Sequence, residues 1–248
     1  MIRRALLAIA LAAAGLTQAA AQGRHPDLSG VWIISKRSSS GYADASGRPL
    51  DPAPYTAWAR DERAKARPTA DPASQCLTMF PRLMGWPYPI QILQTPKSTV
   101  ILFEADTTYR QIYMDGRRLD PDEDPAWMGH SVGRWDGDVL VVETLGVKPD
   151  AWLDADGTPI SEAQHITERL RLIDGGRSLE DLMTVTDPKV FTQPVVKRYV
   201  YNLKRDWSLK EYVCEEGNRD DVSHPRPGAP GSLSDGPRAQ NPPAKEGS

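Results

Sequence analysis

Apolar and polar residues alternate in short runs along most of the chain after residue 30, and turn residues separate the runs. Alternation with a period of two is typical of strands that bury one face. The runs predict about ten strands, which are residues 30–34, 89–95, 99–104, 109–114, 129–135, 138–146, 164–173, 178–186, 195–204 and 208–214. Short strands at close spacing favour an all-β fold, an antiparallel up-and-down β-barrel of about eight to ten strands. A barrel of this size either fills with side chains or holds one small ligand.

The clearest pair of strands lies in residues 129–146, GHSVGRWDGDVLVVETLG. Asp136-Gly137 is a preferred two-residue hairpin turn, and closing the turn there places His130 opposite Glu143. Opposed side chains in an antiparallel ladder lie about 4.5–5.5 Å apart at Cβ, so the carboxylate would orient the imidazole for acid–base chemistry. The alternative is a half-exposed ion pair on the face of the sheet.

A second hairpin is predicted around Gly175-Gly176, and its register pairs His165 with Thr186 and Leu170 with Asp181. Glu168 and Asp181 then become diagonal neighbours on a mostly apolar face, which is unusual for carboxylates. Either they raise each other's pKa and serve as acid and base, or they meet arginines from adjacent strands. His165, Arg169 and Arg171 would lie on the opposite face.

Two loops are unusually apolar, and a long excursion separates the first two strands. Residues 37–76 lack strand alternation, and residues 54–66 within them predict one helix that packs on the barrel. After this excursion, the loops around residues 77–89 and 124–128 carry large apolar side chains, among them Met84, Trp86, Tyr88, Trp127 and Met128. Either these loops plug one end of the barrel, or they line the mouth of a pocket for an apolar or aromatic ligand.

The N-terminus predicts export. Residues 1–21 contain two arginines, an apolar run and three alanines before Gln22, the pattern of a cleaved signal peptide. This indicates a periplasmic or secreted protein, in which Cys76 and Cys214 are expected to form a disulfide. The single barrel domain is then residues 22–216. Residues 217–248 hold many prolines and glycines and no aromatic residue, so they are expected to be a disordered tail.

Charge and motifs narrow the classes of partner. The chain has 30 Lys+Arg and 33 Asp+Glu, a net charge of −3, which does not suggest a nucleic-acid or anionic-membrane partner. No later stretch has about 18 uninterrupted apolar residues, so no membrane span is expected. The sequence also contains none of the common metal-binding, nucleotide-binding or nucleophile-elbow motifs. The expected partner is a small molecule, with no metal and no cofactor, and the oligomeric state stays open.

Several motifs carry a resemblance. In order along the chain they are PDLSGVW, PRLMG, IYMDGR, GHSVGRWDGDVLVVET, HITERLR and EYVCEE. Together they resemble a broad group of uncharacterised secreted bacterial proteins, over roughly residues 27–216, with GHSVGRWDGD as the most specific part. Gly30-Val31-Trp32 also resembles the entry to the first strand of lipocalin-like (calycin) barrels. The resemblance implies one secreted β-rich domain and no particular activity.

Two hypotheses of function follow. The first is a cofactor-independent lyase, isomerase or hydrolase that uses His130 as general base, oriented by Glu143. The second is a non-catalytic, lipocalin-like carrier of a small hydrophobic ligand. The candidate catalytic residues are His130, Glu143, His165, Arg117 and Arg169, and the candidate ligand-binding residues are Met84, Trp86, Tyr88, Arg110, Tyr113, Trp127 and Met128.

Overall fold

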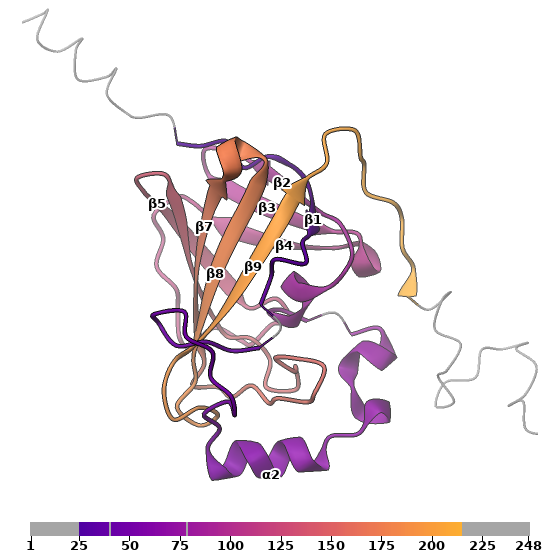
Figure 1. Ribbon diagram of the computed structural model, residues 1–248, viewed down its shortest axis with the longest axis vertical. Coiled ribbons are helices and arrows are strands. Elements are labelled where there is room, and N and C mark those ends of the chain that lie inside the picture. The colour runs from indigo at the N-terminus through magenta and orange to yellow at the C-terminus, as the bar shows by residue number, and fades with distance from the viewer. Residues whose placement is uncertain (1–24, 40, 78, 215–248) are drawn as a thin grey trace, which may run out of the picture.

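A computed structural model describes residues 25–39, 41–77 and 79–214. Nine strands form one closed barrel in sequence order, which confirms the predicted all-β barrel and is consistent with a lipocalin-like architecture (Figure 1). The strands are β1 Gly30–Ile34, β2 Ile90–Gln94, β3 Ser98–Phe103, β4 Thr108–Tyr113, β5 His130–Asp136, β6 Val139–Leu145, β7 His165–Ile173, β8 Ser178–Thr186 and β9 Val195–Leu203. The predicted signal peptide and the whole of the predicted tail lie outside the described residues.

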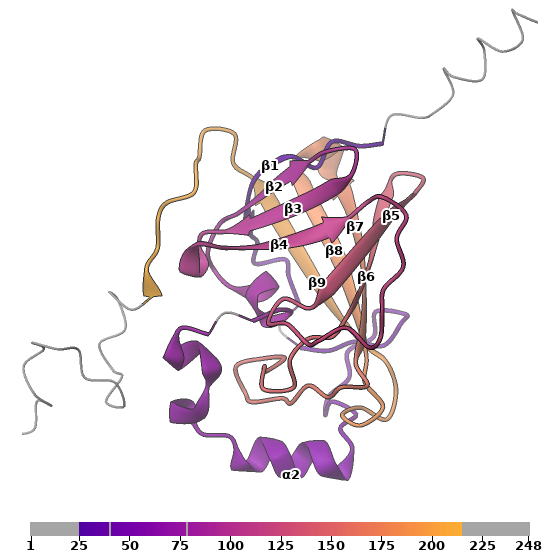
Figure 2. The same ribbon diagram turned by 180° about the vertical axis from the view of Figure 1, so that it is seen from behind.

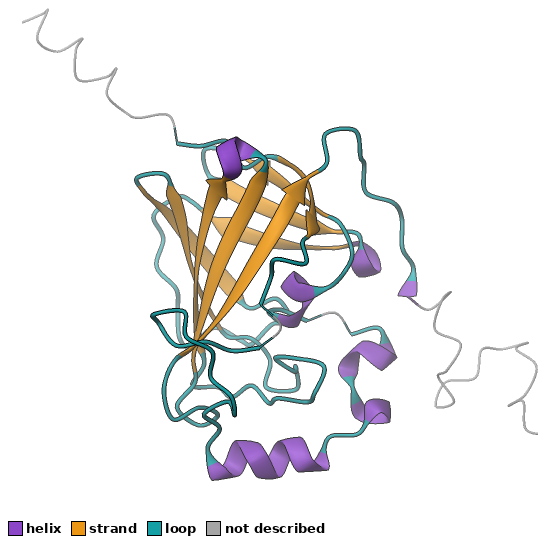
Figure 3. Ribbon diagram, in the orientation of Figure 1, coloured by secondary structure: helices purple, strands orange, loops and turns teal. Residues whose placement is uncertain are grey.

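Helical segments lie outside the strands, as Figure 3 shows. The α-helix among the described residues is α2, Ala57–Lys65, and the short 3₁₀ segments are η1 Pro68–Ala70, η2 Pro72–Gln75, η3 Arg82–Gly85, η4 Ala105–Thr107 and η5 Asp174–Gly176. Thr56 caps α2, because its side chain accepts a hydrogen bond from the backbone of Ala59. The helix lies beyond the loops at one end of the barrel (Figure 1), within the predicted excursion.

Two features differ from a simple meander. Strands β4 and β5 pair in parallel, because residues 114–129 carry the chain back along the barrel between them (Figure 2). The strand predicted at residues 208–214 is absent, because β9 already closes the barrel against β1. That segment instead hydrogen-bonds along the outside, where Tyr212 exchanges two bonds with the hydroxyl of Thr107.

The register of the first hairpin corrects the prediction. Asp136 pairs with Val139, so Gly137 and Asp138 are the central turn residues, and His130 pairs with Leu145 instead of Glu143. Gly137 has a φ of +60°, and a glycine at the first central position is typical of a type II′ turn. The turn lies one residue later than predicted, so each residue pairs two positions away from its predicted partner. Residues that were predicted to share a face of the hairpin therefore still share one. The register of the β7–β8 hairpin is confirmed, with Leu170 opposite Asp181.

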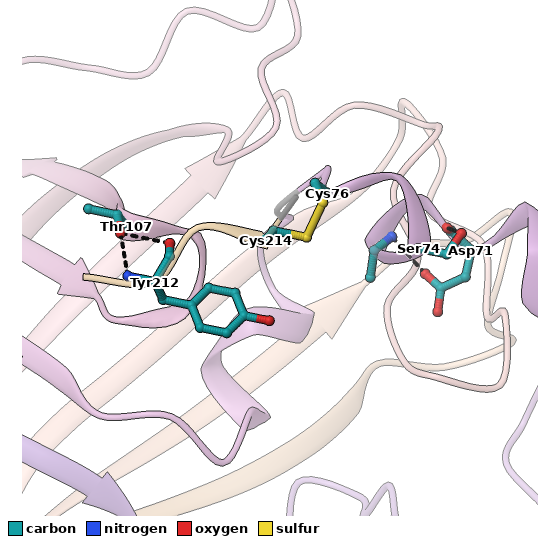
Figure 4. The surroundings of a disulfide bond; sticks show 7 residues. Asp71, Ser74, Cys76, Thr107, Tyr212 and Cys214 are labelled. Atoms are coloured by element: carbon teal, nitrogen blue, oxygen red, sulfur yellow. Dashed lines mark hydrogen bonds between the residues drawn. A yellow bond between two sulfur atoms is a disulfide. The ribbon is translucent and has the colours of Figure 1, made fainter. Parts of the chain in front are cut away.

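A disulfide joins Cys76, just after η2, to Cys214 at the end of the described chain (Figure 4), as predicted. The two Cα atoms are 5.6 Å apart, and 138 positions separate the cysteines in sequence. The bond fastens the outer segment that follows β9 to the excursion. No helix among the described residues is long and apolar enough to cross a membrane.

Candidate functional site

The barrel interior contains a buried ion pair. Arg110 on β4 and Glu168 on β7 are 1 % and 0 % exposed, and they form a two-pronged contact in which Nη1 donates to Oε1 over 2.9 Å and Nη2 donates to Oε2. Alternation along both strands points them inward, since Ile112 and Ile166 beside them are also buried. Two parallel hydrogen bonds between guanidinium and carboxylate are among the strongest polar contacts in proteins.

Hydroxyl groups from the next two strands complete the surroundings of Arg110. Its Nε donates to the hydroxyl of Ser131 on β5 (3.1 Å), and its Nη2 donates to that of Thr144 on β6 (2.9 Å). The ring of Phe80 covers the guanidinium, with its centroid 3.8 Å from Cζ. The cation is therefore fixed on every side, which offsets part of the cost of burying it.

Asp181 on β8 is the exception in this interior. It is completely buried, and neither carboxyl oxygen has a hydrogen-bond partner among the described residues. Burial raises the pKa of Asp181 well above its usual value, the charge of Glu168 raises it further, and Arg110 only partly opposes this. Burial thus favours the protonated, uncharged form of this carboxyl group, a form that can donate a hydrogen bond to a ligand. We call Arg110, Glu168 and Asp181 the interior centre.

Two tyrosines of β9 adjoin the interior centre. Tyr199 pairs with Asp181 in the ladder, and Tyr201 lies two residues further along the same face. Burial, followed by the charge of Asp181, raises the pKa of both phenols. The hydroxyl of Tyr201 donates to the backbone carbonyl of Met84 in η3 (2.6 Å), so η3 is fastened to the inside of the barrel wall.

The apolar loop before β2 enters the barrel. Met79, Phe80, Leu83 and Met84 are all buried in the core, so of the two readings of this loop the burial supports a plug. We call residues 79–85 the plug segment. Trp86 and Tyr88 follow it, only partly buried, with ring centroids 6.3 Å apart.

The predicted histidine–glutamate pair lies on the outer face of the barrel and is not formed. Nδ1 of His130 lies 3.2 Å from Glu123, and its Nε2 is 2.8 Å from the carbonyl of Asp124. Glu143 instead binds Arg134 at 2.8 Å, and Nε2 of His165 is 3.9 Å away. The physical reason is the register, because Val132 occupies the position opposite Glu143.

The other candidate residues are distributed over several surfaces. Arg169 lies on the outer face and binds Asp136 (3.1 Å). Arg117 is exposed, binds Asp115 and covers the ring of Tyr113 at 3.6 Å. At the other apolar loop, Lys148 covers the ring of Trp127, and Trp127 and Met128 are partly buried. Of the twelve candidate catalytic and ligand-binding residues, the structure brings Arg110 to the interior centre and Met84 to the plug segment.

The sequence contained a signal for most of the interior centre. The second hairpin placed Glu168 and Asp181 on one apolar face, and one of the two readings expected arginines to meet them. Glu168 does meet Arg110, which comes across the barrel from β4 instead of from an adjacent strand. Ser131, Thr144, Tyr199 and Tyr201 were not predicted, although the same alternation carried through β5, β6 and β9 would have pointed them inward.

The outside of the molecule carries a cleft of about 600 Å³ between α2 and the loop that precedes β7. Trp58, Trp152 and Ile160 form part of its lining, with Glu62 and Lys65 at its side. No group of three or more histidine, cysteine, aspartate or glutamate side chains within the described ranges is placed to hold a metal ion. Comparison with models of known protein families found no match, and a search of curated proteins found none either.

Proposed function

We propose that this protein is a periplasmic or secreted β-barrel that binds a small apolar or aromatic molecule and acts on it at the interior centre by acid–base chemistry without a cofactor. The observation that carries the proposal is the carboxyl group of Asp181, which is fully buried and has no hydrogen-bond partner in the described part of the chain. Such a group costs free energy in a folded protein unless something binds it. A polar atom of a ligand is the partner that we infer.

The chemistry follows from the charges. Asp181 as a neutral acid can donate a hydrogen bond or a proton to a carbonyl, hydroxyl or leaving-group oxygen. Glu168 stays bound to Arg110, and this pair supplies a fixed electrostatic field beside the reacting atoms. A proton donor in a dry, preorganised site suits a lyase, an isomerase or a hydrolase. The proposed chemistry does not use His130 or Glu143, which lie on the outer face of the barrel.

The plug segment determines access. Phe80 lies directly on Arg110, so a ligand reaches the interior centre from this end of the barrel when the plug segment yields. The surrounding walls are apolar, with Ile112, Leu170 and Met183 completely buried. Such walls favour an apolar or aromatic body that carries one polar group.

The location outside the cytoplasm belongs to the same proposal. It is supported by the disulfide between Cys76 and Cys214, since such bonds persist mainly in oxidising compartments, and by the signal-peptide pattern of residues 1–21. Membership of the group of secreted bacterial proteins that share the GHSVGRWDGD motif is likewise proposed. No activity is taken from that group.

The test combines a ligand screen with one substitution. Small aromatic and apolar carbonyl or hydroxyl compounds are screened by thermal shift against the wild-type protein, Asp181→Asn and Asp136→Asn. Asp136 is the control because it is an exposed carboxylate on the outer face. Ligands of the interior centre should raise the Tm of the wild type and of Asp136→Asn, and lose most of the effect in Asp181→Asn. Equal shifts in all three proteins would place the ligand elsewhere and refute the proposal.

A non-catalytic carrier is the second candidate function. It is favoured by the apolar walls and by the fixed partners of Arg110. Within the centre, Asp181 is the group that lacks a hydrogen-bond partner among the residues that the structure describes. A ligand found in the screen is incubated with the protein, extracted and analysed by mass spectrometry. A carrier returns it unchanged, and an enzyme converts it in a reaction that Asp181→Asn abolishes.

A further inference from the structure

Lys197 on β9 is a lysine that points toward the barrel interior. It pairs with Met183 in the ladder, and Val195 and Tyr199, two positions to either side, are both buried on the same inner face. Lys197 itself is only partly buried. It therefore stands where the inner face meets the loops, between bulk water and the interior.

The ammonium group has an aromatic neighbour and no carboxylate within ion-pair distance in the described part of the chain. Nζ of Lys197 lies 5.0 Å from the centroid of Tyr42, and none of the ion pairs between described residues includes it. The ring of Tyr42 continues into an aromatic cluster, with Phe191 at 5.3 Å and Tyr55 at 6.4 Å between centroids. An aromatic compound brought to this amine would find rings beside it.

The charged groups around Lys197 have partners of their own. Asp154 accepts hydrogen bonds from the hydroxyls of Tyr42 (2.7 Å) and Thr158 (2.6 Å). Asp156 in the same loop pairs with Arg63 at 3.5 Å.

From η3, Arg82 faces Lys197 and binds Asp71 at 2.7 Å. Burial lowers the pKa of Lys197, and Arg82 adds to this, while Asp154 and Asp156 oppose it. A larger share of this amine is thus uncharged near neutral pH than for a lysine in water.

We propose that Lys197 captures an aromatic aldehyde or ketone covalently, as an imine. The lone pair of the uncharged amine forms a C–N bond to the carbonyl carbon while the C=O π bond opens, and its oxygen takes up one of the two protons of the amine. The resulting carbinolamine loses that oxygen as water together with the two protons that the amine carried, and a C=N bond remains. The step needs no oxidant, reductant or cofactor, and partly desolvated lysines are suited to it.

This inference stands apart from the proposed function, because it uses a different side chain at the loop end of the barrel. Its experiment separates the two. Imine formation should persist in Asp181→Asn, whereas ligand binding at the interior centre should not.

The experiment uses the full mature protein with benzaldehyde, and sodium cyanoborohydride reduces the imine to a stable benzyl adduct. Peptide mapping by mass spectrometry then locates the adduct. At pH 7 and limiting aldehyde, we expect at least about fivefold more benzyl on Lys197 than on Lys189, because burial keeps more of Lys197 uncharged. Lys189 is the matched comparison, since it is exposed and also lies over an aromatic ring, that of Trp58 at 4.5 Å.

Two variants and a pH series complete the test. Lys197→Arg should lose the dominant adduct, Lys189→Arg should keep it, and the preference for Lys197 should shrink as the pH rises and the exposed lysines also lose their protons. Labelling spread evenly over the exposed lysines, or an unchanged adduct pattern in Lys197→Arg, would overturn the proposal.

Discussion

An arginine–glutamate pair on the outer face of the barrel and another in its interior have similar contact distances and differ in burial. On the outer face, Arg134 and Glu143 are 2.8 Å apart with side chains 64 % and 36 % exposed. On the inner face, Arg110 and Glu168 form a contact of 2.9 Å with side chains 1 % and 0 % exposed. Water screens the outer pair, so it adds little to stability. The inner pair is unscreened, and losing either member would strand a charge.

One aspartate on each face shows the same contrast in burial. Asp136 on the outer face is 64 % exposed and lies 3.1 Å from Arg169. Asp181 on the inner face is fully buried and lacks any partner among the described residues. The same residue type is thus exposed and paired with an arginine in one place, and buried with a raised pKa in the other. The comparison shows that the chemistry of a strand residue depends more on whether its side chain lies on the inner or the outer face than on its neighbours in sequence.

The largest difference in unfolding free energy between the two faces is expected when the arginine of each pair is replaced. Arg110→Met should lower the free energy of unfolding by about 3–5 kcal/mol, because Glu168 becomes a buried charge without a counter-ion. Arg134→Met should cost less than about 1 kcal/mol. Urea unfolding at pH 7 measures both. Similar losses of unfolding free energy in the two variants would contradict the expected difference between the inner and the outer pair.

The pH dependence of stability should isolate Asp181. Its folded pKa is raised above the ordinary 3.8, so the folded protein holds a proton that the unfolded chain releases. The stability that this proton supplies is fully present below the unfolded pKa and is lost as the pH rises toward the folded one. Relative to the wild type, Asp181→Asn should therefore gain up to about 1.4 kcal/mol per pH unit as the pH rises from the unfolded pKa toward the folded one. Parallel curves for the two proteins would mean that Asp181 is ionised when folded.

Removing the unpartnered carboxyl group should stabilise the protein. Asp181→Val replaces two buried oxygens with a side chain that suits a strand, and we expect a gain of about 1–3 kcal/mol at pH 7. Asp181→Asn should gain less, because its amide stays buried without partners. Chemical unfolding of both variants measures the difference. A loss of stability in Asp181→Val would show that the carboxyl group supports the fold.

Sequence reasoning was strongest where one face of a strand is buried. The period-two pattern predicted the barrel and which residues of each hairpin share a face, because a slip of one residue would expose an entire apolar face, but it did not predict which face lies inside. The turn in β5–β6 was placed one residue early. Asp136-Gly137 and Gly137-Asp138 are both acceptable turns, and the two choices leave the same residues facing inward, so the pattern could not distinguish them.

The interior centre was harder to predict, because its members meet across the barrel. Arg110 on β4 and Glu168 on β7 are separated by two strands in the sheet, and cross-strand pairing describes only adjacent strands. The plug segment was left as one of two alternatives for a similar reason. The sequence around Phe80 and Met84 does not distinguish a loop that enters the barrel from a loop that lies at its rim.

The smallest effects are expected from the outer-face pair that the sequence favoured. His130→Ala removes a ring that holds residues 123 and 124, and Glu143→Gln weakens an exposed ion pair with Arg134. Because both groups are partly in water, each change should cost less than about 1 kcal/mol of unfolding free energy. Neither should alter the thermal shift produced by a ligand of the interior centre, since both side chains point away from it. Thermal-shift titration of the two variants beside Asp181→Asn measures this. Loss of the ligand-induced shift in Tm in His130→Ala would indicate that the ligand acts at the outer face.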